Sequence, residues 1–423
     1  MLPEIHTPIP GPRSRELAAK LRAYESRNVT FLADDWPIFW QRAEGVNVWD
    51  ADGNRFLDLT SAFGVSGLGH TNAAVRAALV AQSGELLHAM GDVHPTAVKA
   101  ELCARLSALT FERWGAGAGK TILGNSGFEA VEAALKTALL RTGKAGVLAF
   151  TGGYHGLGFG ALTATGLPFF REPFRAQLAE FAEFVPYPSG EDADLGVLRG
   201  EIERAIRERA IGCILVEPVQ GRGGCVVPPR DFLPMLRAVC DAHGILLVLD
   251  EIYTGFNRTG ALFACEHSRV VPDVICVGKA LTSGFPLSAC VGRAEVMDAW
   301  PESRGEALHT STFLGNPMGC AMALASLEQH ARPETAALVR ERGTKLRAAL
   351  QPLGEVRGLG LMLGVEMADA AVAIAIVKRA LRDGIVLLAD APAGNVLSFA
   401  PPFAIGDEEI AFAAAKLVGY LAD

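Results

Sequence analysis

Three short apolar runs in the middle of the chain constrain its fold most strongly. They are CILVEPV (213–219), ILLVLDE (245–251) and VICVGKAL (274–281). A stretch with helical character, DFLPMLRAVCDAHG, separates the first two and ends in a glycine, a common helix stop. Continuously apolar strands connected by helices predict a parallel β-sheet that is covered on both faces. The expected fold class is therefore α/β.

Charged residues stand at the ends of these three runs. Glu217, Asp250 and Lys279 each lie where a predicted strand ends, and ligands of parallel α/β sheets bind beyond that edge. A buried Asp250 must be paired or hydrogen-bonded, and taken alone it is explained equally well by a helix cap or a salt bridge. A lysine near a core can have a lowered pKa and act as a Schiff-base nucleophile, although Lys279 alone fits a snorkelling lysine better.

Small residues before a predicted helix indicate an anion site. In ILGNSGFEAVEAALK, Ser126 and Gly127 precede apolar residues that recur at helical spacing from Phe128 onward. The free N–H groups and the dipole of a helix N-terminus attract anions, while simple capping by Ser126 is the alternative. Further on, TGGYHG follows the strand-like VLAF and would present the ring of Tyr154 to a planar ligand.

Composition narrows the classes of protein to which this chain can belong. The chain has 423 residues, half of them apolar, which is enough for a large core and a smaller second domain. A net charge of -8 argues against binding nucleic-acid phosphates. The eight cysteines form no C-x-x-C pair and the histidines show no ligand spacing, so reduced core thiols and no metal are expected. Without a signal-like N-terminus or a run of about 20 apolar residues, we expect a cytoplasmic protein with no membrane contact.

The pattern along the chain divides it into three parts. Residues 1–60 hold a proline-rich arm and a predicted hairpin around the Asp-Gly-Asn turn at 52–54. Residues 61–315 carry the apolar strands and form the predicted large domain. Residues 316–423 contain Ala/Leu-rich helices, the strand-like RGLGLMLGVEM and a final helix. We expect this last part to be a smaller α+β domain that packs with the N-terminal arm.

The motifs taken together resemble those of class III aminotransferases, which depend on pyridoxal 5'-phosphate (PLP) and have fold type I. The matching motifs, in the order of that family, are GNSG, GGYHG, VEPVQG, LDEIYTGFNRTG, GKAL, STFLGNP and RGLGLMLGVE. The resemblance implies a homodimer with shared active sites. It also implies transfer of an amino group from an amine or amino acid to a 2-oxo acid, by a ping-pong mechanism through an internal aldimine. A racemase, epimerase or aminomutase of the same family and a non-enzymatic PLP-binding protein are the alternatives.

The resemblance also implies a role for each matching residue. Lys279 would form the internal aldimine and move the proton, and Asp250 would pair with the pyridine nitrogen, because a protonated ring stabilises a carbanion. By the same resemblance, the cofactor phosphate would be held by Ser126, Gly127 and the amide of Phe128. The two faces of the cofactor ring would be covered by Tyr154 and Ile252, and the ring would be surrounded by His155, Glu217 and Tyr253. Thr312 would reach the cofactor phosphate of the partner subunit.

Four positions depart from the pattern of ornithine- and GABA-type members. Leu157 and Ser398 stand where two carboxylate-binding arginines are usual, and Arg222 stands where a glutamate normally neutralises the second arginine. These changes argue against GABA, ornithine and acetylornithine as substrates. Arg222 either binds a substrate carboxylate or makes a surface ion pair. Tyr253 replaces a glutamine near the phenolic oxygen of the cofactor, and tyrosine can also donate a hydrogen bond.

Overall fold

The computed structural model describes residues 1–421, and its largest element is one seven-stranded sheet. The strands are β4 (Gly119–Gly124), β5 (Gly146–Phe150), β6 (Ala182–Val185), β7 (Ile211–Val216), β8 (Leu246–Asp250), β9 (Val274–Val277) and β10 (Ser288–Arg293). Their order is β4-β10-β9-β8-β7-β5-β6. β10 is antiparallel to both neighbours, and all other pairs are parallel. The predicted α/β class with a mostly parallel sheet is confirmed.

Helices cover both faces of this sheet. Those that bury side chains against it are α4 (Ala97–Leu109), α5 (Gly127–Thr142), α6 (Phe159–Ala164), α8 (Leu195–Glu208), α9 (Phe232–His243), α10 (Ala294–Met297) and α11 (Pro317–His330). On β8, Leu247 and Leu249 belong to one core, and Leu246 and Val248 belong to the other. Because both faces are buried, the strand is apolar throughout instead of alternating, as the sequence indicated.

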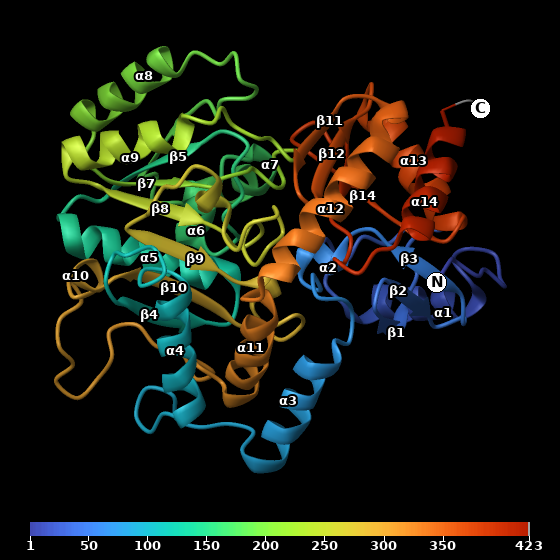
Figure 1. Cartoon of the computed structure of the whole chain (residues 1–423), viewed down its shortest axis with the longest axis horizontal. Coiled ribbons are helices and arrows are strands. Elements are labelled where there is room, and N and C mark those ends of the chain that lie inside the picture. The colour runs from blue at the N-terminus through green and yellow to red at the C-terminus, as the bar shows by residue number, and fades with distance from the viewer. Residues whose placement is uncertain (422–423) are drawn as a thin grey trace.

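A second group of elements lies beside the large sheet (Figure 1). It has two four-stranded sheets: β1 (Trp40–Glu44), β2 (Asn47–Asp50), β3 (Arg55–Asp58) and β13 (Ile385–Val386), and β11 (Val356–Leu359), β12 (Met362–Glu366), β15 (Val396–Phe399) and β14 (Leu388–Asp390). The predicted hairpin is the antiparallel β2–β3 pair. The strand-like run near the C-terminus is also a hairpin, because Gly360 turns the chain at a φ of 55° between β11 and β12.

The remaining longer helices are α1 (Pro12–Tyr24), α3 (Ala73–Glu85), α12 (Pro333–Leu350), α13 (Ala370–Arg382) and α14 (Asp407–Gly419). Within α11, Cys320 and Leu327 are buried in the core of the large sheet, whereas Val339 of α12 belongs to the core of the second group. The boundary predicted at residue 316 therefore falls at the start of a helix that packs with the large domain. We propose that the division lies between α11 and α12.

Candidate active site

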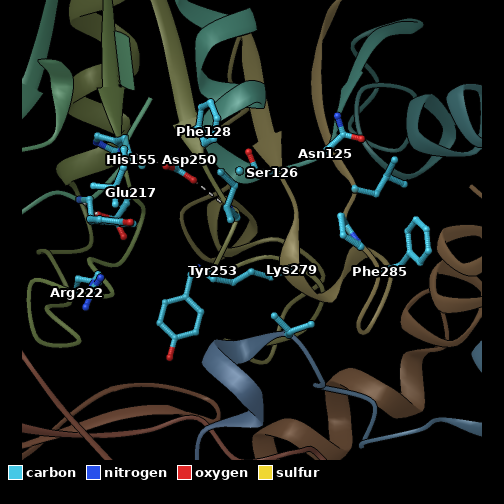
Figure 2. Close-up of a pocket in the computed structure, with 18 of the residues that line it drawn as sticks. Asn125, Ser126, Phe128, His155, Glu217, Arg222, Asp250, Tyr253, Lys279 and Phe285 are labelled. Atoms are coloured by element: carbon cyan, nitrogen blue, oxygen red, sulfur yellow. Dashed lines mark hydrogen bonds and ion pairs between the residues drawn. The ribbon is translucent and has the colours of Figure 1, made fainter. Parts of the chain in front are cut away.

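One cavity of about 590 Å³ lies at the carboxyl edge of the large sheet (Figure 2). Segments that follow β4, β5, β7, β8 and β9 all contribute to its wall, as expected for a parallel α/β sheet. The residues singled out from the sequence that line this cavity are Ser126, Gly127, Phe128, Tyr154, His155, Leu157, Glu217, Arg222, Asp250, Ile252, Tyr253 and Lys279. Residues distant in sequence are thus brought to one place.

Lys279 begins a short 3-10 turn directly after β9. Its φ of 41° lies in the left-handed region, where a residue with a side chain is strained. Burial lowers the pKa of its amine, and the nearby Asp250 and Glu217 carboxylates oppose that effect. A lysine with a lowered pKa has a larger fraction of the neutral amine that nucleophilic attack requires.

Asp250 ends β8 and is only 4% exposed. One carboxylate oxygen lies 2.8 Å from Nδ1 of the buried His155, and the other accepts the N–H of Ile252 at 3.1 Å. Nε2 of His155 has no hydrogen-bond partner within residues 1–421. The carboxylate is therefore fixed in orientation by its neighbours while it faces the cavity.

Glu217 lies just past β7 and is also buried. Its carboxylate accepts the N–H groups of Tyr154 at 2.9 Å and Gly221 at 3.0 Å. Burial raises its pKa to about 7, with His155 opposing the rise and Asp250 adding to it. The two carboxyl groups thus differ in their surroundings, and Glu217 can hold a proton near neutral pH.

The N-terminus of α5 has the features of an anion site. Glu129 accepts the backbone N–H groups of Asn125 and Ser126, but the buried Oγ of Ser126 has no partner within the described residues. The first amides of the helix have no carbonyl of their own helix to bond. A Cβ on Gly127 would lie 2.9 Å from Cδ1 of Ile252, so only glycine fits there without a shift. These residues fit the phosphate of PLP, and Asp250 fits its ring nitrogen.

Two predicted residues lie outside the cavity lining. Ser398, on β15, is 4% exposed, and its hydroxyl lies 3.8 Å from Sγ of Cys225. Thr312 is exposed on the surface of the chain. It directly follows Ser311, whose hydroxyl accepts a hydrogen bond from the side chain of Asn125 at 3.4 Å.

The surroundings of Arg222 reveal a residue that sequence reasoning missed. Nε of Arg222 lies 3.7 Å from Oδ1 of Asp390 on β14, and the guanidinium lies over the rings of Tyr154 and Phe170. Burial raises the pKa of Asp390, while Arg222 opposes the rise. No local motif marks Asp390, because it comes from a strand far along the chain. The guanidinium makes no hydrogen bond within residues 1–421, so its N–H groups are available to a ligand.

Within residues 1–421, no three His, Cys, Asp or Glu side chains are grouped so that they could hold a metal ion. In the same part of the chain, every helix is too short or too polar to cross a membrane.

Comparison with known proteins identifies the family. Residues 31–421 match the model of "Aminotransferase class-III". The chain is 38% identical over 401 residues to the acetylornithine aminotransferase of Methanopyrus kandleri, covering 91% of this chain and 95% of that one. It is 35% identical over 436 residues to the 4-aminobutyrate aminotransferase of Mycobacterium leprae, covering 96% and 95%.

A solved structure agrees with the sequence relatives. The amine transaminase from an uncultivated Pseudomonas species, in its PLP-bound form, superimposes with a TM-score of 0.85 at 29% identity, covering 94% of this chain and 98% of that one. The predicted PLP-dependent fold is therefore confirmed. With the family match over most of its length, the chain belongs to the class III aminotransferases and is a PLP-dependent enzyme.

Proposed function

We propose that this protein moves an amino group from an amine donor to a 2-oxo acid in a ping-pong cycle. The observation that carries the proposal is the meeting of Lys279, Asp250 and the N-terminus of α5 at one cavity. A panel of amine donors, assayed with pyruvate and with 2-oxoglutarate, tests it. Conversion of a donor without consumption of either acceptor would favour the racemase, epimerase or aminomutase reading instead.

Each residue has a physical task in this proposal. PLP, when bound, supplies an electron sink for the bond cleaved at the substrate carbon. Ser126 and the first amides of α5 would hold its phosphate, and Asp250, oriented by His155, would favour a positive charge at the ring nitrogen. Lys279 would bond the cofactor covalently and, once released, carry a proton to and from the substrate carbon.

The cavity wall supports a donor with an uncharged body. Val65, Phe128, Leu157 and Phe285 present apolar side chains, and Leu157 is 50% exposed at the wall. An amine with an apolar substituent would bury surface there, at about 25 cal/mol for each Å² removed from water. A carboxylate acceptor requires a cation as well, and Arg222 supplies one at the cavity with uncommitted N–H groups.

Substitution of Arg222 by alanine should lower kcat/KM for 2-oxo acids about ten- to a hundredfold, because a charge-assisted hydrogen bond is lost. An uncharged aldehyde acceptor should be nearly unaffected. Steady-state kinetics with both acceptor types measure the difference. Arg222→Lys is the matched control, since it keeps the positive charge but loses the planar, two-pronged donor of arginine. Its kcat/KM for 2-oxo acids should lie between those of wild type and Arg222→Ala. Equal losses for both acceptor types would show that Arg222 has a structural role.

We further propose a homodimer in which Thr312 reaches the cofactor phosphate of the partner subunit. Thr312 and its neighbour Phe313 are exposed, and so are Leu87 and Met90. The backbone carbonyl of Leu87 accepts a hydrogen bond from the side chain of Asn316, and the ring of His88 lies 5.2 Å from that of Phe313, so the segment that holds Leu87 and Met90 lies beside the segment of Thr312. Apolar side chains gathered on a surface are typical of protein interfaces.

Replacing Thr312 with alanine should weaken retention of PLP about tenfold without unfolding the protein, because one hydroxyl donor to phosphate is removed. Equilibrium dialysis against PLP measures the change, and Thr312→Ser, which keeps the hydroxyl, should retain the cofactor. Mixed dimers of the Thr312→Ala and Lys279→Ala chains should contain one fully intact site. A fully active monomer in analytical ultracentrifugation would contradict the shared site.

A further inference from the structure

The ring of Tyr253 is held in a slot between two glycines. A Cβ on Gly64 would lie 2.3 Å from Cε2 of the ring, and one on Gly221 would lie 2.4 Å from Cδ1. Gly64 also has a φ of 79°, which disfavours any side chain. The two edges of the ring therefore contact backbone, and one face of the ring is left open toward Lys279.

The amine of Lys279 lies over that face. Its Nζ is 4.5 Å from the centroid of the Tyr253 ring, within the range of a cation–π contact. The hydroxyl of Tyr253 points away from Lys279 (Figure 2), so the two side chains meet through the ring alone. The amine makes no hydrogen bond or ion pair within residues 1–421. Among the described residues, the face of the Tyr253 ring is thus the group that directly contacts the Lys279 amine when it is positively charged.

We propose that the face of Tyr253 is a cation–π platform that holds the ε-ammonium of Lys279 whenever this lysine is not bonded to the cofactor. Tyr253 is then a positioning residue, since it acts through Lys279. The functional meaning of the platform rests on the proposed role of Lys279. The contact itself involves only these two side chains and can be tested in cofactor-free protein.

The platform distinguishes the two protonation states of the lysine. The ring quadrupole attracts the ammonium and has little attraction for the neutral amine. A released lysine that has accepted a proton is therefore kept at the cavity wall, and a lysine that has given the proton away is free to leave the face. The attraction to the Tyr253 ring also offsets part of the free-energy cost of desolvation, which disfavours the charged form of Lys279.

Other charged groups around the lysine must be considered in any titration. Asp250 and Glu217 from the sheet edge and Asp390 from β14 favour the ammonium, whereas Arg222 disfavours it. All four are unchanged in variants of Tyr253, so a comparison among such variants isolates the ring. Tyr253→Phe keeps the face and loses only the hydroxyl, and Tyr253→Leu removes the face.

The experiment is trace acetylation of the cofactor-free protein with acetic anhydride from pH 6 to 10. The rate at Lys279 is followed by peptide mass spectrometry and normalised to the exposed Lys20. Below the pH of half-maximal labelling, Tyr253→Leu should label Lys279 roughly three- to thirtyfold faster than wild type, and the rate at high pH should be unchanged. Tyr253→Phe should follow the wild-type profile.

Three outcomes would overturn the platform. One is an identical pH profile for Tyr253→Leu and wild type. Another is a rise of the high-pH rate without a shift of the profile, which would indicate easier access only. The third is a shift in Tyr253→Phe as large as in Tyr253→Leu, which would assign the effect to the hydroxyl.

An isosteric series keeps the test decisive if Tyr253→Leu does not fold. Phenylalanine with one to three ring fluorines at position 253 preserves the shape of the ring while weakening its negative face. Labelling of Lys279 should accelerate with each fluorine, and a flat series would refute the proposal. Failure of PLP to attach to Lys279 would instead sink the proposed function and leave these results on the cofactor-free protein intact.

Discussion

Replacing Lys279 with alanine is expected to lower kcat at least about 10⁴-fold, the largest effect of any single substitution in this protein. The change removes both the covalent attachment of the cofactor and the proton carrier, and the carrier alone is typically worth about 10²- to 10⁴-fold. The alanine side chain leaves the other cavity residues in place, so PLP should still bind without a covalent link. Single-turnover assays with a saturating donor measure the loss.

The site of attachment provides an independent check of Lys279. Borohydride reduction of the wild-type holoenzyme should link PLP to the peptide that contains Lys279, and the Lys279→Ala protein should yield no such peptide. Lys279→Arg is the matched control, because it keeps a cation at the same place but cannot form the link. Small primary amines added to Lys279→Ala should restore part of the proton transfer. Labelling at another lysine in the wild type would refute the assignment.

The second large effect is expected for Asp250→Asn. The amide has nearly the shape of the carboxylate but no charge, so it no longer favours a positive ring nitrogen, and kcat should fall by about 10²–10³-fold. Folding should be preserved. In wild type the N–H of Ile252 donates a hydrogen bond to the Asp250 carboxylate, and an asparagine oxygen can accept the same bond. Circular dichroism verifies the fold, and absorbance titration verifies PLP binding.

A cofactor analogue provides the control for Asp250. When PLP is replaced by its analogue with carbon in place of the ring nitrogen, wild type should fall to the level of Asp250→Asn. The variant itself should lose little more, since the two changes remove the same interaction. Full additivity of the two losses would show that Asp250 acts elsewhere, for example by holding His155.

The strands and their polar ends were predictable because both signals are local. Continuous apolar runs mark strands buried on two faces, and the positions of Glu217, Asp250 and Lys279 follow from where those runs stop. The sequence also indicated the hairpin and the start of α5. It assigned α11 to the smaller domain, whereas this helix buries Cys320 and Leu327 in the core of the large sheet, because an Ala/Leu-rich helix has the same pattern in either core.

The contacts around Arg222 and Tyr253 were not predictable from the sequence. The pairing of Arg222 with Asp390 joins a loop of the large domain to β14, and no spacing in the sequence encodes it. The slot of Tyr253 depends on Gly64 and Gly221, which approach the ring from two separate segments. The sequence could show that Tyr253 departs from the usual residue, but only the fold shows what its ring contacts.

The parallel pairing of β3 with β13 has a consequence for the synthesis of this protein. Leu57 and Asp58 are synthesised long before their sheet partners Ile385 and Val386, which follow 328 residues later in the chain. At about 5–20 residues per second, the edge of β3 stays without its partner for many seconds. An unpaired strand edge is a site of aggregation, so the nascent chain is open to misassembly at this edge until β13 has been made.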